Sequence, residues 1–259
     1  QRPPIARPGH AILVYEVPAP SISPSWVAQC TQPVHPLTSQ AVTDGFGRDD
    51  LRMIFFDCTQ SWLYPEGETA PGWYALHRDV LPTKAPFVAR HLQGTQLSYQ
   101  QHADRALPAF ALYERPSETS WPEFETVDAP LLDGPLHFLG YAAPSQPLYP
   151  GESVKVETWW QVQETTRRPL SLMLHLIGPD GAPTIIGDGL GVPVEQWRRG
   201  DVLVQHHRLD LPPQAPAGTY TLYTGAYWLD TLERWRVSGK DEPAGDQITL
   251  SPVRVVTSR

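Results

Sequence analysis

The chain has 259 residues, of which 41% are hydrophobic and 19% charged, and its net charge is −8. This composition excludes a disordered tail and a broadly basic nucleic-acid-binding surface, so we expect a folded chain with no nucleic-acid partner. No apolar run approaches the roughly 20 residues of a membrane span, and we expect no membrane insertion by this fragment. Asparagine is absent and prolines number 29, which favours a heat-adapted source, although a GC-rich genome would equally explain the excess of arginine over lysine.

The first half alternates strand-like and helix-like segments. Ser23 followed by Pro24 predicts the start of a helix in SPSWVAQCTQ, and APFVARHLQ predicts a second short helix. Apolar or alternating runs predict strands at AILVYEV (11–17), LRMIFFDC (51–58), GWYALH, QLSYQQ and AFALYE. This alternation indicates a small α/β domain.

A polar, proline-containing segment at 115–125, RPSETSWPEFE, predicts a linker, and we set the domain boundary between residues 118 and 119. After it, short β-rich segments are separated by Gly, Pro and Asp turns, which is typical of a β-sandwich. The AGTY stretch ending at Tyr220 is similar to the tyrosine corner of such folds. The predicted fold class is therefore α+β, with a small α/β domain (1–118) and an all-β immunoglobulin-like or jelly-roll-like sandwich (119–259).

The chain has two cysteines, Cys30 and Cys58. In an oxidising compartment such a pair is often bridged, whereas two cytosolic cysteines are usually buried thiols. We favour a disulfide. Two cysteines without a C-x-x-C motif are too few for a structural zinc site unless histidines complete it, so we expect no metal and no cofactor.

Two adjacent histidines occur in the stretch VLVQHHRLDL. Because neighbouring residues of a strand point to opposite faces, His207 belongs with the inward Leu203 and Leu209, and His206 belongs with the exposed Arg208. The two imidazoles therefore cannot chelate one metal ion together, and we interpret the stretch as a strand.

The same alternation separates the tryptophans of SVKVETWWQV. Trp160 shares a face with Val154 and Val156 and belongs to the core, whereas Trp159 shares a polar face with Lys155 and is expected to be exposed. An exposed aromatic ring can stack on a sugar or meet a partner, but it can also pack under a loop or against another domain.

Tyr223 and Tyr227 share one face of the strand TYTLYTGAYW and have the same two interpretations. The candidate ligand-binding residues are thus Trp159, Tyr223 and Tyr227.

Catalytic motifs are absent: the sequence has no G-x-S-x-G, no P-loop and no H-E-x-x-H. The glycine-rich GDGLG stretch at 187–191 leads into no helix and predicts a turn. The carboxylates of GRDD (47–50) are typical of a solvated loop. Asp57, at the end of a predicted strand, is the best single candidate in the first half, but one carboxylate makes no mechanism. No catalytic residue is predicted.

The second half has a distinctive succession of strands and turns, from YPGESVKVETWWQV to DQITLSPVRVV. It resembles the soluble region that follows the membrane helices in bacterial protein O-mannosyltransferase-like membrane glycosyltransferases. The first half, with FFDCTQSWLYPEGETAPGWYAL, resembles the segment that lies between those two parts. Gln205, where an acidic residue is common, departs from the pattern, and the loop between Asp188 and Trp197 is short. The matching positions are Pro150, Gly151, Trp160, His175, Leu176, Asp180, Gly181, Asp188, Trp197, Gly200, Tyr220, Gly225 and Tyr227.

The resemblance implies an extracytoplasmic location, at the cell surface or in the periplasm, and a tether to a membrane portion of the same parent chain. It transfers no catalytic residue, because the catalytic acid of that family lies in the membrane portion. The leading hypothesis is a non-catalytic module for scaffolding or for contact with a glycan or glycosylated acceptor. The alternatives are a free-standing carbohydrate-binding protein and, ranked last, a hydrolase centred on the first domain.

Overall fold

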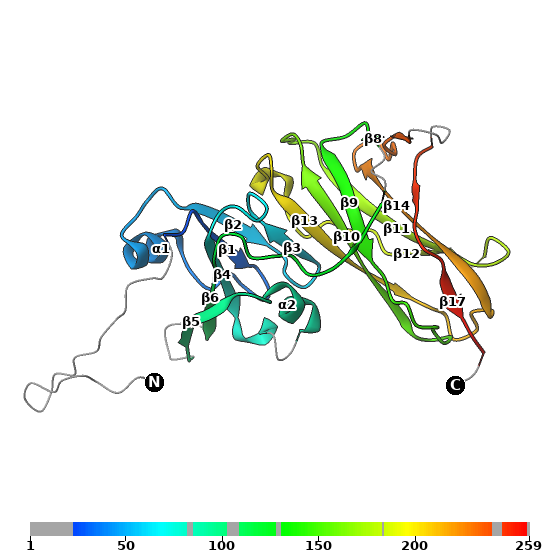
Figure 1. The fold of residues 1–259 in the computed structure, drawn as a ribbon, viewed down its shortest axis with the longest axis horizontal. Helices are drawn as coiled ribbons and strands as arrows, with labels where there is room; N and C mark the ends of the chain where they lie inside the picture. The colour runs from blue at the N-terminus through cyan, green and yellow to red at the C-terminus, as the bar shows by residue number, and fades with distance from the viewer. Residues whose placement is uncertain are drawn as a thin grey trace, which may run out of the picture.

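The computed structural model describes residues 23–81, 85–102, 109–127, 131–182, 184–239 and 245–257. In these ranges the chain is mostly β, with several sheets (Figure 1). The predicted strand at 11–17 lies outside the described residues. Neither α-helix of the described ranges has the length and apolar character that crossing a membrane requires.

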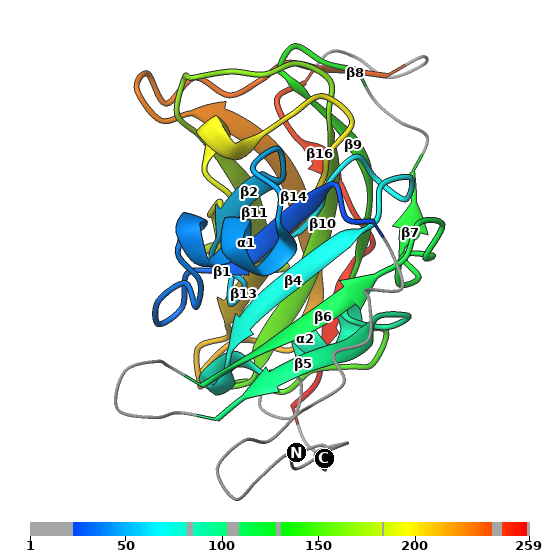
Figure 2. The same cartoon turned by 90° about the vertical axis from the view of Figure 1, so that its left-hand side faces the viewer.

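A mixed five-stranded sheet forms the N-terminal half, with the strand order β2-β1-β4-β6-β5. Strand β1 pairs in parallel with β2 and β4, whereas β6 is antiparallel to β4 and β5. The two helices lie on opposite faces: α1 is on the outer face and α2 lies between this sheet and the rest of the molecule (Figures 1 and 2). The elements are β1 (Trp26–Cys30), α1 (Ser39–Phe46), β2 (Arg52–Phe56), β4 (Gly72–His77), η1 (Arg78–Val80), α2 (Pro86–His91), β5 (Gln96–Gln101) and β6 (Phe110–Arg115).

The helix predicted after Ser23 is wrong, because Trp26–Cys30 is the strand β1 and all five of its residues are buried. Val27 packs with Val42 of helix α1, whereas Trp26 and Ala28 join the main core on the opposite face. A strand between two parallel neighbours is covered on both sides and needs a nearly continuous apolar sequence. That requirement outweighs the capping signal of Ser23 and Pro24.

The C-terminal half is a β-sandwich of two five-stranded sheets. The first sheet has the order β3-β13-β10-β9-β7, and the second has the order β12-β11-β14-β16, with β17 also paired to β14. The elements are β3 (Ser61–Tyr64), β7 (Glu125–Thr126), β8 (Leu131–Leu132), β9 (Leu136–Ala142), β10 (Ser153–Val162), β11 (Leu170–Ile177), β12 (Thr184–Ile186), η2 (Val194–Gln196), β13 (Val202–Asp210), β14 (Gly218–Trp228), β15 (Val237–Ser238), β16 (Ile248–Thr249) and β17 (Val253–Val255).

The sandwich core follows the alternation expected from the sequence. Val154, Val156 and Trp160 of β10 are buried, as are Leu172, Leu174, Leu176 of β11 and Leu222 of β14. At the start of β14 the Tyr220 hydroxyl donates a hydrogen bond of 3.0 Å to the carbonyl of Pro216, four residues upstream. This is the bond that defines a tyrosine corner.

The two halves are joined by a shared sheet, because β3 belongs to the N-terminal half of the chain but pairs with β13 of the sandwich. A buried ion pair also links them: Arg52 of β2 binds Asp201 through two contacts of 2.7 and 2.5 Å. The carboxylate of Asp201 additionally accepts hydrogen bonds from two backbone amides, those of Glu66 and Arg198. The boundary at residues 118 and 119 stays a prediction.

Candidate functional site

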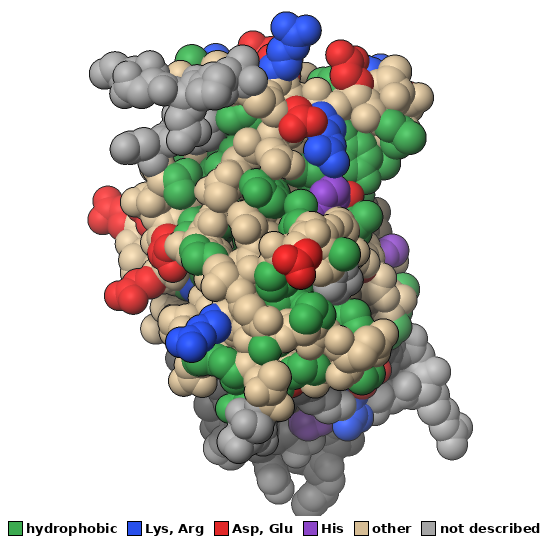
Figure 3. Space-filling model, turned by 90° about the vertical axis from the view of Figure 1, so that its right-hand side faces the viewer, with side chains coloured by type: hydrophobic (Ala, Val, Ile, Leu, Met, Phe, Trp, Pro, Cys, Tyr) green, Lys and Arg blue, Asp and Glu red, His purple; other side chains and the backbone are tan. Residues whose placement is uncertain are grey.

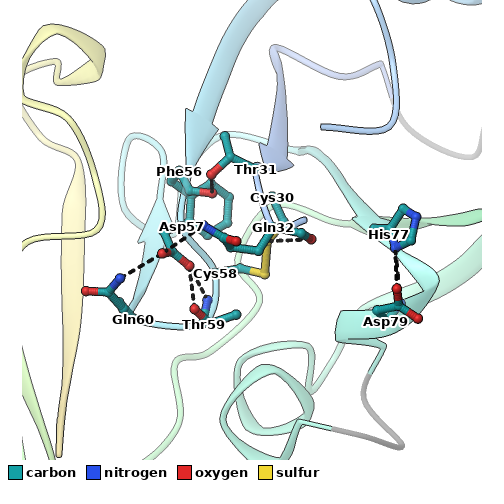
Figure 4. Close-up of a disulfide and its surroundings, with 10 residues drawn as sticks. All are labelled: Cys30, Thr31, Gln32, Phe56, Asp57, Cys58, Thr59, Gln60, His77 and Asp79. Atoms are coloured by element: carbon teal, nitrogen blue, oxygen red, sulfur yellow. Dashed lines mark hydrogen bonds and ion pairs between the residues drawn. A yellow bond between two sulfur atoms is a disulfide. The ribbon is translucent and has the colours of Figure 1, made fainter. Parts of the chain in front are cut away.

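The two cysteines lie at the carboxyl ends of neighbouring parallel strands. Cys30 is the last residue of β1, Cys58 comes two residues after β2, and their sulfurs are joined in a disulfide with the Cα atoms 5.2 Å apart (Figure 4). Both residues are fully buried. The bridge therefore ties the ends of two strands together inside the core and leaves no exposed thiol for chemistry.

Asp57 precedes Cys58, and its carboxylate is occupied by local hydrogen bonds. Its oxygens accept from the amide and hydroxyl of Thr59 at 2.9 and 2.6 Å, and from the side-chain amides of Gln60 and Gln32 at 2.8 and 3.2 Å (Figure 4). This is the bonding of an aspartate that stabilises a turn. Asp57 has no base or nucleophile beside it in the described structure, and we assign it a structural role.

The exposure predicted for Trp159 is wrong, and the alternative interpretation, packing under another part of the chain, is the correct one. Its side chain does lie on the opposite face of β10 from Trp160, but both tryptophans are fully buried. The Trp159 ring is stacked against Phe124 at 4.5 Å and against Tyr64 at 5.7 Å between centroids. The polar neighbours Lys155 and Glu157 suggested a solvated face, but Phe124 of the 115–125 segment and His91 of α2 pack on it. Trp159 offers no surface for a ligand.

Tyr223 and Tyr227 lie on the outer face of the second sheet and are half-buried there. Cross-strand pairing sets Tyr223 opposite His175 of β11, and His175 opposite Ile186 of β12. Because directly paired residues share a face of a sheet, these three side chains form a row across three strands. Ile186 at the end of the row is 62% exposed.

Asp188 completes this group. It lies in the turn after β12, and its carboxylate is 3.3 Å from Nε2 of His175 and accepts a 2.9 Å hydrogen bond from the amide of Leu174. Burial alone would raise the pKa of Asp188, but His175, the Leu174 amide and the Tyr227 hydroxyl together hold that pKa below its ordinary value. We call the surface made by His175, Ile186, Asp188, Tyr223 and Tyr227 the tyrosine face.

The tyrosine face combines flat aromatic surface with hydrogen-bonding groups fixed by the sheet. It faces away from the N-terminal sheet, and on that side of the molecule uncharged polar and hydrophobic side chains predominate over scattered charged ones (Figure 3). A carboxylate, an imidazole and two phenols can exchange hydrogen bonds with hydroxyl groups while the rings contact an apolar surface. The arrangement suits binding of a neutral polar ligand better than bond cleavage, since no activated nucleophile accompanies the imidazole within the described residues.

The adjacent histidines point to opposite faces of β13, as the alternation predicts. His207 is fully buried between the sheets, where Nδ1 donates to the carbonyl of Gly187 at 2.6 Å and Nε2 accepts from the hydroxyl of Thr158 at 2.8 Å. Burial lowers the pKa of His207 to about 4. His206 is half-buried against Phe87, with ring centroids 4.5 Å apart. The two rings therefore cannot share a metal ion.

The sequence reasoning did not place His175 and Asp188 in the candidate site. The alternation of β11 sets His175 on the outer face, which was a usable signal once the core face was known. Asp188 had no such signal. Its position depends on the turn that brings Gly189 beside Leu172, a pairing that no periodicity reveals.

Comparisons with known proteins add little. No model of a known protein family matches the sequence, and no curated protein sequence matches it either. Among solved structures, one described as the crystal structure of the C-terminal domain of wzt has a TM-score of 0.33 and 13% sequence identity, covering 52% of this chain and 82% of that chain. This likeness is too slight to support an inference about fold or function.

Proposed function

We propose that the chain is a non-catalytic module that contacts a glycan or a glycosylated acceptor through its tyrosine face. The observation that carries the proposal is the row of Tyr223, His175 and Ile186, with Asp188 and Tyr227 beside it, on the sheet face turned away from the N-terminal half. Sugar rings have both an apolar face and hydroxyl groups, and this surface offers a partner for each.

The two tyrosines, Asp188 and Ile186 would divide the contacts with a sugar between apolar packing and hydrogen bonding. The rings of Tyr223 and Tyr227 would pack on the C–H face of a sugar, and Asp188 would accept hydrogen bonds from its hydroxyl groups. The exposed side chain of Ile186 would extend the apolar contact. Because charged side chains are scattered on this side of the molecule, we expect neutral glycans to bind in preference to acidic ones (Figure 3).

We further propose that the module is extracytoplasmic and belongs to a larger membrane-anchored, glycosyltransferase-like protein. The buried disulfide supports an oxidising compartment, because such bonds persist outside the cytosol. The gene sequence upstream of Gln1 tests the membrane part of this proposal. Several apolar segments of about 20 residues in the same reading frame are expected. Without them, a free-standing carbohydrate-binding protein becomes the better hypothesis.

A glycan array probed with the intact chain tests the binding role. We expect retention of neutral glycans, and we expect Tyr223→Ala and Tyr227→Ala each to weaken binding by about tenfold with little change in Tm. Tyr99→Ala is the matched control, since Tyr99 is an exposed tyrosine of β5 in the N-terminal sheet. Equal retention by wild type and by the double variant of Tyr223 and Tyr227 would contradict the assignment.

The division into residues 1–118 and 119–259 is also a proposal. It is supported by the N-terminal half having a sheet and two helices of its own. Limited proteolysis tests it, with the first cut expected within 115–125. A single resistant core trimmed only at its ends would instead favour one folding unit, which the pairing of β3 with β13 makes a serious alternative.

A further inference from the structure

A second candidate site lies on the opposite side of the sandwich from the tyrosine face. There a cleft of about 440 Å³ opens between helix α2 and the outer face of the first sheet. A volume of this size is in the range of small-molecule sites. We call it the junction cleft, and the residues that line it include Pro86, Phe87, Arg90, Lys155, Glu157 and His206.

The buried base of the cleft is a carboxylate with its charge already balanced. Glu157 is only 6% exposed, and its Oε2 atom lies 3.2 Å from Nη1 of Arg90 and 3.5 Å from Nε2 of His91. The other ring nitrogen of His91 is 2.7 Å from the Tyr64 hydroxyl. With Nε2–H directed at the carboxylate, Nδ1 of His91 accepts from Tyr64. The 3.5 Å approach of Nε2 to the carboxylate is an electrostatic contact and not a hydrogen bond, so among the described residues only the Tyr64 hydroxyl is hydrogen-bonded to this ring.

The pKa directions agree with that assignment. Burial lowers the pKa of His91, which therefore stays uncharged. Burial alone would raise the pKa of Glu157, but His91 and the Arg90 guanidinium outweigh it and lower that pKa, so the carboxylate stays ionised. The positive charge of Arg90 and the negative charge of Glu157 then cancel. The carboxylate therefore does not make the cleft attractive to a cationic ligand.

Two other polar groups of the cleft, Lys155 and the His206 ring, have no ion-pair or hydrogen-bonding partner among the described residues. Lys155 is exposed and forms no ion pair with any described residue. Nδ1 of His206 and Oε2 of Glu157 are buried without a hydrogen-bond partner among the described residues, although the His206 ring packs on Phe87 and Oε2 lies in the ion pair with Arg90. Buried polar atoms nearly always find partners, so an open one lining a cleft points to a ligand. The described lining side chains carry one positive charge in excess.

We propose that the junction cleft binds a small organic anion that carries a carboxylate or a phosphate group. Lys155 and the remaining N–H groups of Arg90 would hold the anionic group, and Nδ1 of His206 would donate a hydrogen bond to it. Phe87 and Pro86 would contact the apolar part of the molecule. The ligand differs in charge from the neutral glycans proposed for the tyrosine face, and the two sites do not depend on each other.

Isothermal titration of the intact chain tests the proposal with three probes: inorganic phosphate, glucuronate and the neutral methyl glucoside. Saturable 1:1 binding is expected for at least one of the two anions, and no binding for methyl glucoside. Lys155→Met, which keeps the length of the side chain, should weaken anion binding by about tenfold, as expected for the loss of one charge-assisted contact. Binding by glucuronate alone or by phosphate alone supports the proposal and identifies the anionic group.

Arg254→Ala is the matched control, because Arg254 is an exposed cation on β17. It should leave anion binding unchanged, and so should Tyr223→Ala, which separates this site from the tyrosine face. The proposal is overturned if neither anion saturates, if methyl glucoside binds as well as the anions, or if Lys155→Met binds like the wild type.

Discussion

The outer faces of the two sandwich sheets carry similar side chains but meet different surroundings. On the first sheet, Trp159 is stacked against Phe124 and Tyr64 and is fully buried. On the second sheet, Tyr223 and Tyr227 are half-buried, and Ile186 beside them is 62% exposed. Strand alternation sets all four on outward faces. The exposure of each is then decided by whether another part of the chain covers that face.

This difference changes what an aromatic residue on a sandwich face indicates. An outward tryptophan next to lysine and glutamate has the pattern of an exposed binding residue, yet here it is buried against Phe124 and against His91 of α2. The outward tyrosines have the same pattern and remain accessible. Covering one face also creates the junction cleft at the rim of the covered area, where Lys155 and His206 lie.

Replacing each tryptophan of β10 tests the covered face most directly. Trp159→Ala and Trp160→Ala should each lower the free energy of unfolding by about 3–5 kcal/mol, because both remove a large side chain from a packed core. Urea unfolding measures both losses. A loss below about 1 kcal/mol for Trp159→Ala alone would mean that this face is open in solution.

The buried ion pair between the halves offers a second way to disturb the covered face. Arg52→Ala leaves the fully buried carboxylate of Asp201 without its charge partner and should destabilise the chain by about 3–5 kcal/mol. Arg168→Ala, which removes the cation of the surface pair with Asp230, should change stability little. Similar unfolding curves for the two variants would argue against the linkage of the halves.

Removing the disulfide should weaken the covering half and leave the open face intact. Cys30→Ser with Cys58→Ser opens a loop with a sequence separation of 28 residues and should lower stability by about 3.6 kcal/mol in the chain-entropy model. Glycan binding by the tyrosine face should persist at temperatures where the variant is folded. Two free thiols on titration of denatured, unreduced wild type would refute the bridge.

Acid should destabilise the core that lies between the two faces. His207 has a pKa of about 4 in the folded chain against an ordinary value of 6.5, so between these pH values the unfolded chain binds a proton that the folded chain does not. Stability should therefore fall as the pH drops through this window, by at most about 1.4 kcal/mol per pH unit for this residue. Burial lowers the pKa of His91 and His206 as well, so both act in the same direction. Unfolding free energies at several pH values check the slope, which His207→Gln should reduce.

Local patterns in the sequence predict much of this fold and only part of the candidate site. The core positions of β10, β11 and β13 follow from alternation, and so do the opposite orientations of His206 and His207. Alternation left Trp159 open between exposure and packing under another part of the chain, because its burial depends on Phe124 and Tyr64, which are distant in sequence. The sequence of β1 does not distinguish a strand from a helix, because a short apolar run that is buried on both faces shows no hydrophobic periodicity. Asp188 joins the tyrosine face through a turn that alternation does not encode.

The pairing of β3 with β13 replaces a nine-residue strand at the edge of the first sheet with a four-residue strand whose residues are all buried, and a short covered edge disfavours self-association. A sandwich whose outermost strand is unpaired presents a row of open backbone N–H and C=O groups, a template on which further chains can add strands. β3 occupies that edge of β13 through four paired residues, from Val202 with Tyr64 to Gln205 with Ser61. Partial opening that detaches the N-terminal half would uncover this template and the Trp159 surface together. Thermal unfolding of this chain should therefore be irreversible, and aggregation should be faster at higher protein concentration.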